Sequence, residues 1–572
     1  MSIDIETYRL KAQEAIEYVF VKEYHNSLGI PMPIVKMLLP DDANYSTGQY
    51  YITIDKTWQI HLNFGKLPIS YHEFQNEVKV LTRHEIEHYM CCPFDVITHF
   101  RMLKRIRDVY YKHFSHLGIN IEYACGAISN QAADIIVDTK NYYRHSKETL
   151  KSEIDWIKIG ANISACPRHC KLMFLTKEAI WKEDLGINET DPEFLKIVHQ
   201  LADSFTKNGI EDKSSFLDKV EEYAEIFFKL YVEDQKNPQQ SSQQGSQQQS
   251  GQQGSQQQSG QQGSQQQSGQ WGVGRPKDGD EHGNAFVFAD PDKVKEAIEV
   301  LAEETSVEEF IDLLAIAGII GMSDKQKGVL WFNVQSANII PIVEFSNTGN
   351  KSSYTYPSVW RIGDPIEELD LMLTYMTSPR LIPGMTTKKW EYVSNDDNGT
   401  ESKQMDLLLV VDTSGSMGSA MKESANMHQA VLASYGILSY FESTKSKVAF
   451  IGFSDKIDAY VDWSDKYDDV RERLLTNGHG GTKFPISRIK STLDVRSRDL
   501  VTVLITDGDL GNINESVSYF RDYLNDDNKL YIFLLGGSKS LHSYEPLKNI
   551  GAKIYNANNA NEFCDMVLTD ME

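Results

Sequence analysis

Short apolar runs alternate with segments of helical length in the last third of the chain. Four of these runs have strand length: Leu407–Val411, Lys447–Phe453, Val501–Thr506 and Leu530–Leu535. Strands that alternate with helices predict a parallel sheet flanked by helices. We therefore expect an α/β domain over residues 403–572.

The first 235 residues show a different pattern. Gln49–Asp55 and Trp58–Phe64 are rich in aromatic and β-branched residues, and the two residues between them predict a pair of adjacent strands. Helical patterns follow over Tyr71–Cys91, Val96–His113, Cys125–His145 and Leu217–Asp234. This mixture predicts an α+β domain over residues 1–235.

A low-complexity tract separates these two regions. Between Gln239 and Gln270 the unit GSQQQSGQQ starts at Gly245 and Gly254, and a third copy from Gly263 ends in tryptophan. Such side chains bury no apolar area, so nothing offsets the entropy lost on ordering. We expect a disordered linker over residues 236–284, with a Gln-rich aggregation segment as the alternative.

Residues 285–402 form a connecting region of mixed character. Pro291–Gly318 predicts two helices, and Pro341–Glu401 predicts short strands among several prolines. A chain of 572 residues is long enough for several domains. The sequence thus predicts a multidomain protein with two folded parts, a linker and a connecting region.

The charge balance and the cysteines argue against several classes of function and indicate where the protein is located. The chain carries 81 acidic against 57 basic side chains. This excess argues against a nucleic-acid or anionic-membrane binder, which needs a basic face. The first twenty residues lack a secretory pattern, and no run of 18 uncharged apolar residues predicts a membrane span. Six cysteines are too few for a disulfide scaffold, so we expect a cytoplasmic protein.

The predicted helix Tyr71–Cys91 carries the first candidate site. It contains an HExxH pattern from His84 to His88. Residues four apart share a helix face, so both imidazoles can bind one zinc ion, which keeps an open position in catalytic sites. Glu85 is then a candidate base for a water molecule. The alternative is a surface helix with two ordinary histidines.

A second predicted helix carries Asn130, Asp134 and Asp138 at a spacing of four, and therefore on one face. With these residues the sequence resembles the gluzincin peptidases and a bacterial family of metallopeptidases joined to von Willebrand factor A domains. The resemblance makes Asp134 the third zinc ligand and Asp138 the partner that fixes a histidine tautomer, with Asn130 beside them.

Two departures from the gluzincin pattern leave other ligands open. Aspartate stands where those peptidases have glutamate, and the interval between His88 and Asp134 is long. It contains three histidines that are alternative third ligands: His99, His113 and His116. Cys166, His169 and Cys170 are a further candidate for a structural zinc site, with buried, inert cysteines as the alternative.

The second candidate site follows the strand Leu407–Val411. Asp412, Ser414 and Ser416 form a DxSxS pattern. Hydroxyl and carboxylate oxygens suit Mg²⁺, and open α/β sheets bind ligands at the carboxyl ends of their strands. Downstream, Thr482 supplies a hydroxyl in a glycine-rich loop, and Asp507 follows another strand. We interpret the nearby Asp509 as a turn residue.

These three pieces resemble the von Willebrand factor A (VWA) domain and its metal-ion-dependent adhesion site (MIDAS). The resemblance implies a Rossmann-like fold over residues 403–572 and a Mg²⁺ ion held by five residues: Asp412, Ser414, Ser416, Thr482 and Asp507. In this family an acidic side chain from a partner completes the coordination. Trp360–Pro365 and Ile382–Thr387 are similar to stretches found in bacterial proteins that work with MoxR-type AAA+ ATPases.

Together these features predict a zinc-dependent peptidase with a zincin-like N-terminal domain and a tethered VWA domain. The VWA domain would bind a protein or peptide substrate through Mg²⁺, with a MoxR-type AAA+ ATPase as a candidate partner. The alternative is a non-catalytic VWA adaptor that couples such an ATPase to clients, with a structural or residual zinc site. A third hypothesis is self-cleavage at the tether.

Overall fold

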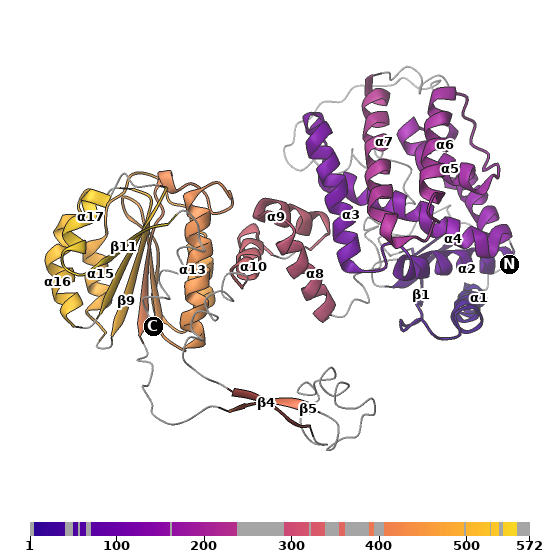
Figure 1. Cartoon of the computed structure of the whole chain (residues 1–572). Helices are drawn as coiled ribbons and strands as arrows, with labels where there is room; N and C mark the ends of the chain where they lie inside the picture. Colours follow the sequence, from indigo (N-terminus) through magenta and orange to yellow (C-terminus); the bar gives the residue numbers. More distant parts are fainter. Residues whose placement is uncertain are drawn as a thin grey trace. The chain divides into compact units, whose positions relative to one another are not determined.

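The structure is a computed structural model of the chain (Figure 1). It describes residues 5–40, 50–54, 58–64, 70–160, 163–236, 291–319, 322–337, 354–360, 388–393, 405–496, 499–508, 510–526, 528–536 and 541–557. Almost all of the predicted linker, most of Trp360–Pro365 and all of Ile382–Thr387 lie outside these residues. The chain divides into two compact units, of residues 1–305 with 309–322 and of residues 306–308 with 323–572.

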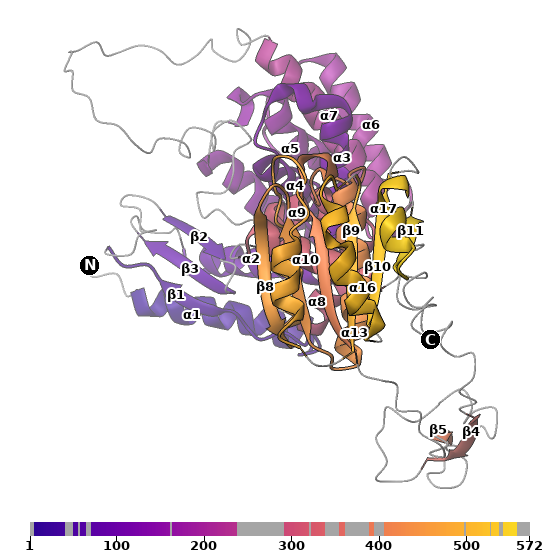
Figure 2. The same cartoon turned by 90° about the vertical axis from the view of Figure 1, so that its left-hand side faces the viewer.

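The first unit contains a three-stranded sheet in the order β1-β3-β2. β3 (Gln59–Phe64) pairs in parallel with β1 (Ile34–Met37) and antiparallel with β2 (Tyr50–Ile54). On β3, Ile60 and Leu62 are fully buried in a core shared with α1 (Ile5–Glu17) and α2 (Tyr71–Met90). Figure 2 shows α1 beside this sheet. The predicted pair of adjacent strands is therefore present, and the sheet lies against the helix that carries the HExxH pattern.

Helices make up the rest of this unit. Their bounds are α1 Ile5–Glu17, α2 Tyr71–Met90, α3 Val96–Val109, α4 Ile121–Gly160, α5 Arg168–Trp181, α6 Pro192–Thr206, α7 Phe216–Lys236, α8 Pro291–Glu303 and α9 Val307–Ile316. Short π- or 3₁₀-helical turns are η1 Tyr18–Glu23, η2 Tyr110–Phe114, η3 Ser115–Leu117, η4 Ile163–Ala165 and η5 Lys213–Ser215. The apolar pattern of the sequence does not predict α5. Polar residues such as Lys171 and Lys177 are buried on this helix and interrupt its apolar periodicity.

Helix α4 is bent into two arms. His145 has φ −136° and ψ 47°, which are not helical values, so residues 121–144 and 146–160 are separate helical segments. The second arm is tied to α2 by ion pairs from Lys151 to Glu73 and from Glu148 to Arg83. The bend therefore brings the later part of α4 back along the HExxH helix.

Helices α8 and α9 belong to the first unit, although they follow the low-complexity tract. α8 packs against α3, where Arg101 pairs with Glu304 just after α8. Arg107 of α3 also pairs with Glu309 and Asp312 of α9, at 3.2 and 2.8 Å. The sequence placed both helices in a separate connecting region, whereas the structure joins them to the N-terminal helices.

The second unit is built on a six-stranded sheet in the order β11-β10-β9-β6-β7-β8. All neighbouring pairs are parallel except β7 and β8. This is the strand order of a doubly wound α/β sheet, with its switch point between β6 and β9. The bounds are β6 Asp406–Asp412, β7 Val448–Phe453, β8 Ile457–Ser464, β9 Leu500–Thr506, β10 Lys529–Leu535 and β11 Lys553–Ala557.

Helices cover both faces of this sheet, α13 on one side and α15, α16 and α17 on the other (Figure 1). Their bounds are α10 Asp324–Ala337, α13 Asn426–Ser443, α14 Tyr467–Leu474, α15 Ile486–Leu493, α16 Val517–Asn525 and α17 Leu541–Lys548, with η8 Gly415–Met417 and η9 Ile513–Ser516. β4 (Tyr354–Val359) and β5 (Lys388–Val393) form a separate antiparallel pair. Among the described residues, no helix has the length and apolarity needed to span a membrane.

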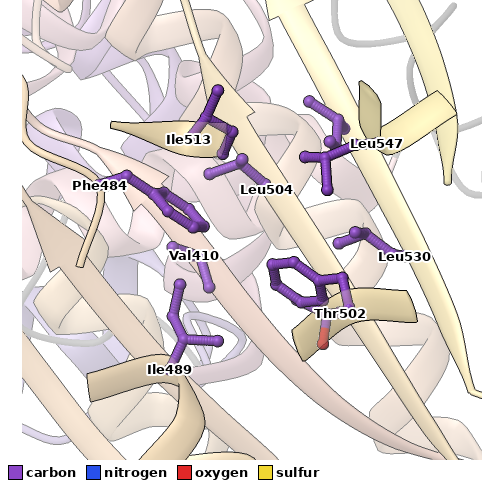
Figure 3. A pocket seen from close by; sticks show the side chains of 10 residues that line it. Val410, Phe484, Ile489, Thr502, Leu504, Ile513, Leu530 and Leu547 are labelled. Carbon is purple, nitrogen blue, oxygen red and sulfur yellow. The ribbon is translucent and has the colours of Figure 1, made fainter. Parts of the chain in front are cut away.

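The space between the sheet and α15–α17 is filled by side chains (Figure 3). Val410 and Leu504 of the sheet meet Phe484, Ile489 and Leu547 from the covering segments. They leave no room for a water molecule. This region is therefore core and has no room for a ligand.

Candidate metal centres

Three potential ligand atoms converge in the first unit. The Nε2 atoms of His84 and His88 lie 3.1 Å apart. Oδ1 of Asp134 lies 3.1 Å from Nε2 of His88 and 3.4 Å from Nε2 of His84. Within the described part of the chain, this is the one group of three or more His, Cys, Asp or Glu side chains arranged to hold a metal ion. Asp134 thus occupies the position proposed for the third ligand, and His99, His113 and His116 do not.

The hydrogen bonds of the two histidines set their tautomers. Nδ1 of His84 lies 2.6 Å from the Asp138 carboxylate, and Nδ1 of His88 lies 2.9 Å from the Cys92 carbonyl. Both partners are acceptors, so each Nδ1 carries the proton and donates it. In the neutral rings, each Nε2 then presents a lone pair toward the other and toward Asp134.

This arrangement fits a cation. Two imidazole lone pairs and a carboxylate oxygen face one another in a buried place, and Oδ1 of Asp134 accepts no hydrogen bond. Ligands about 2.0–2.1 Å from a tetrahedral zinc lie about 3.3 Å apart. The observed separations of 3.1 to 3.4 Å agree with that value. The donor set and its spacing both suit Zn²⁺.

The pKa values show how strongly these groups interact. Burial alone would raise the pKa of the Asp134 carboxyl, but His84 and His88 outweigh it and hold the pKa well below its usual range. Burial likewise works against a charged His84, yet Asp138 and Asp134 raise its pKa to about 10. The two carboxylates therefore stabilise a positive charge at this position.

Asn130 and Asp138, which the sequence predicts beside the ligands, contact Asp134 and His84, and a lysine that was not predicted joins them. Asn130 donates to Oδ2 of Asp134 at 3.2 Å. Lys177 of α5 donates to Oδ2 of Asp138 at 2.9 Å and to Glu153 at 2.5 Å. Burial works against its charge, but these carboxylates raise the pKa of Lys177 and keep it a cation. We call the Glu153–Lys177–Asp138 contacts the lysine bridge.

An adjacent face of α2 is fixed by a second set of charges. Arg83 pairs with Glu23 of η1 at 2.6 Å and with Glu148 of α4. Glu87, fully buried, pairs with Lys140 at 2.8 Å and Arg144 at 2.9 Å. Arg83 and Glu87 repeat the spacing of His84 and His88 one position earlier on the helix. One pair of positions presents the histidines, and the other holds α2 in place.

The candidate base Glu85 is also part of α2 and is only 9% exposed. It adjoins His84 in the sequence, as the HExxH pattern requires.

The DxSxS loop of the second unit lies at the carboxyl end of β6. Oδ1 of Asp412 accepts from the Ser414 backbone N–H at 2.9 Å, and Oδ2 accepts from the Thr506 hydroxyl at 2.7 Å. The hydroxyls of Ser414 and Ser416 lie 3.2 Å apart, and Ser416 donates to Asp507 at 3.0 Å. Four of the five predicted magnesium ligands are thus brought together at the switch point of the sheet.

The loop that carries the remaining predicted ligand, Thr482, lies beside the DxSxS loop. The Gly415 N–H donates to the Gly480 carbonyl at 3.3 Å, which places the glycine-rich loop that carries Thr482 beside the DxSxS loop. Gly480 has φ 114°, a conformation that favours glycine. Thr482 itself is half-buried. Asp509 lies outside the described residues.

Two residues that the sequence analysis missed hold Asp507 and its loop. Asn426, the first residue of α13, donates to Oδ2 of Asp507 at 3.1 Å. Tyr544 of α17 donates to the Gly508 carbonyl at 2.7 Å. Neither has a local sequence signal, because their partners lie far away in the chain. The collected hydroxyl and carboxylate oxygens are the hard donors that Mg²⁺ prefers. Burial raises the pKa of Asp412.

The proposed cysteine site is not assembled in the same way. His169 is buried and its Nδ1 lies 2.8 Å from Asp234. Cys170 is buried, and burial raises the pKa of its thiol to about 12. Among the described residues, Cys166, His169 and Cys170 do not form a metal-holding group.

In comparisons with known proteins, no family model matches the chain, and no curated protein matches it.

Proposed function

We propose that the first unit is a zinc-dependent peptidase with a zincin-like fold, and that the second is a VWA domain that binds an acidic side chain of a protein partner through Mg²⁺. The observation that carries the peptidase proposal is the convergence of three lone-pair donors, His84, His88 and Asp134, on one point. Three protein ligands leave a fourth position for water or substrate, as in catalytic zinc sites.

Each residue of the first site has a distinct task. His84, His88 and Asp134 hold the ion. When bound, zinc polarises a peptide carbonyl and makes a nearby water more acidic. Glu85 takes the proton from that water and passes it to the leaving amine. Asp138 keeps the His84 proton on Nδ1, so that Nε2 stays free to bind metal.

The sheet offers a means of holding an extended substrate. Among the described strands, β2 pairs with β3 alone and is an edge of the sheet that packs beside α2. An extended peptide can add to such an edge through backbone hydrogen bonds, which do not depend on side-chain identity. This supports peptides and unfolded protein segments as the substrate class.

The second unit supports a role in capture. Its hydroxyls and carboxylates lie at the switch point of a doubly wound sheet, where such sheets bind ligands. Binding a client there would raise its concentration near the peptidase. By family resemblance, a MoxR-type AAA+ ATPase that unfolds clients is a candidate partner.

Glu85→Gln tests the enzymatic proposal. We expect the variant to keep its zinc, because no ligand changes, and to lose peptidase activity by about 10²- to 10⁴-fold. Activity is measured by mass spectrometry of a peptide mixture, and zinc by elemental mass spectrometry. Ser414→Ala is the matched control and should cleave short peptides normally. A zinc-loaded wild type that cleaves no peptide or unfolded protein would favour the adaptor alternative.

A further inference from the structure

The lysine bridge connects two parts of α4 that are distant along the helix. Asp138 and Glu153 are 15 residues apart. A straight helix would separate them by about 22 Å. Both nevertheless bind Nζ of Lys177, at 2.9 and 2.5 Å. The bend at His145 makes this geometry attainable, since the two carboxylates lie on opposite arms at similar distances from it.

Lys177 pairs with the Asp138 carboxylate in a buried place, where an unpaired negative charge would lower the stability of the fold. Its own side chain is 2% exposed, and that of Asp138 is 9% exposed. Asp138 has two oxygens, one for His84 and one for Lys177. Because each oxygen has its own donor, the carboxylate plane is fixed, and Oδ1 is aimed at Nδ1 of His84. Without the lysine, a buried anion would keep only the neutral imidazole as a donor.

We propose that Lys177 is a positioning residue for the metal site, which acts on the ligand His84 through Asp138 and ties the second arm of α4 to that site. This inference rests on the zinc site proposed above. It assigns Lys177 no contact with the substrate or the ion. Its effect is on the orientation of a ligand, and therefore on how tightly and in what geometry the metal is bound.

Glu153 provides an internal comparison. It binds the same ammonium group from the other arm, whereas the carboxylate that binds Nδ1 of His84 is that of Asp138. Removing the Glu153 charge leaves the Lys177–Asp138 pair intact. Removing Lys177 leaves Asp138 without its cation. The two substitutions therefore separate loss of the bridge to the second arm from loss of the support to the ligand.

The test measures metal affinity in the full-length chain. Zn²⁺ dissociation constants are obtained by competition with a chromophoric chelator for wild type, Lys177→Met, Lys177→Gln and Glu153→Gln. We expect Lys177→Met to weaken zinc binding by about 10- to 100-fold. Lys177→Gln, which can still donate a hydrogen bond to Asp138, should lose less. Glu153→Gln should stay within about threefold of wild type, because the carboxylate–imidazole contact is unchanged.

Two further measurements distinguish a positioning role of Lys177 from a general loss of protein stability. In the Asp138→Asn background, Lys177→Met should have little additional effect on zinc affinity, because its route to His84 is already broken. With Co²⁺ in the site, the visible absorption bands should shift in Lys177→Met and remain as in wild type in Glu153→Gln. If Lys177→Met does not fold, the zinc affinity and the Co²⁺ spectrum of Lys177→Gln test the proposal instead.

The outcomes distinguish this inference from the proposed function. Failure of wild type to bind zinc would overturn both. Tight zinc binding by wild type and by both Lys177 variants, with unchanged Co²⁺ spectra, would overturn the positioning role alone. An equal effect of Lys177→Met with and without Asp138→Asn would also overturn it, since the lysine would then act by another route.

Discussion

The two candidate metal centres hold their ligands by different means. In the first unit, the ligands come from α2 and α4 and are fixed by ion pairs that involve α5 and both arms of α4. In the second unit, they come from the end of β6 and from loops at the carboxyl ends of the strands, and they are fixed mainly by backbone and hydroxyl hydrogen bonds. The geometry of the first site therefore depends on how helices pack, and the geometry of the second site depends on the order of the strands.

The exposure of the ligands also differs between the two sites. The side chains of His84 and His88 are 5% exposed, whereas the second site is buried at Asp412 and Ser414 but exposed at Ser416 and half-buried at Asp507. A buried site of nitrogen and carboxylate donors suits an ion that stays and does chemistry. A site of hard oxygens that is open on one side suits an ion that keeps waters and exchanges one for a partner's carboxylate. The comparison predicts independent sites with different responses to substitution.

The largest expected effect is loss of one metal without the other. His84→Ala and Asp134→Ala should abolish the zinc, about one ion per chain in wild type, because each removes one of three protein ligands. Ser414→Ala should leave zinc unchanged and weaken Mn²⁺, used as a paramagnetic probe of the magnesium site. Elemental analysis and Mn²⁺ titration give the two values. Zinc retained in Asp134→Ala would place the third ligand elsewhere.

A smaller effect separates the two glutamates of the HExxH pattern, Glu85 and Glu87. Glu87→Gln should lower the free energy of unfolding of the first unit by about 3–5 kcal/mol, because it breaks the buried pairs of Glu87 with Lys140 and Arg144 and leaves Lys140 only Glu211, at 3.3 Å. Glu85→Gln, on the same helix, should cost far less stability and yet remove activity. Urea unfolding of the zinc-loaded proteins measures both. Similar stabilities for the two variants would contradict the assignment of Glu87 to holding α2.

The contributions of His84 in the first unit and His428 in the second unit to stability should respond to pH in opposite directions. The pKa of His84 is raised to about 10, so in chelator-treated protein its contribution to stability is complete below pH 6.5 and is lost as pH rises through 10. His428 of α13, buried against Trp331, Phe332 and the Ala420 carbonyl, has a lowered pKa. Because its neutral form is favoured by folding, the second unit should lose stability as pH falls below 6.5.

Hydrogen exchange, corrected for the intrinsic rate at each pH, reports the two units separately. His428→Gln should remove the acid sensitivity of peptides from α10 and α13, and the first unit serves as the control. Glu423 is the nearby charged group that favours the protonated form of His428. Unchanged acid sensitivity in His428→Gln would assign the effect to another group.

The smallest predicted effect concerns the support of Asp507. Asn426→Ala should weaken Mn²⁺ binding about fivefold, the equivalent of one hydrogen bond of roughly 1 kcal/mol. Tyr544→Phe, which removes a bond to the neighbouring carbonyl, should have less effect because it leaves both Asp507 oxygens as they are. A larger loss in Tyr544→Phe would show that the loop, and not the carboxylate, controls the site.

The parts that the sequence predicted are those with local signals. The histidines four apart, the shared face of Asn130, Asp134 and Asp138, and the DxSxS loop after a buried strand all follow from short-range periodicity and strand topology. The strand order of the second unit agrees with the predicted alternation of strands and helices. The zincin and VWA assignments remain predictions.

The parts that the sequence did not predict depend on contacts between distant segments. Lys177 has no motif, and its role requires both the unpredicted helix α5 and the bend at His145. The Cys92 carbonyl that sets the His88 tautomer is a backbone atom, which no side-chain pattern can indicate. Asn426 meets Asp507 only because β6 and β9 are neighbours in the sheet.

The docking of α8 on α3 has a consequence for limited proteolysis. A protease that cuts in the Gln/Ser/Gly tract, between Gln239 and Gln270, would sever the backbone of the first unit without removing a piece of it. Arg101 and Arg107 would still hold Glu304, Glu309 and Asp312. The nicked protein should elute from gel filtration as one particle and give two bands on a denaturing gel. By the same logic, a fragment that ends at Lys236 lacks two helices of its own unit and should be less soluble than the nicked whole.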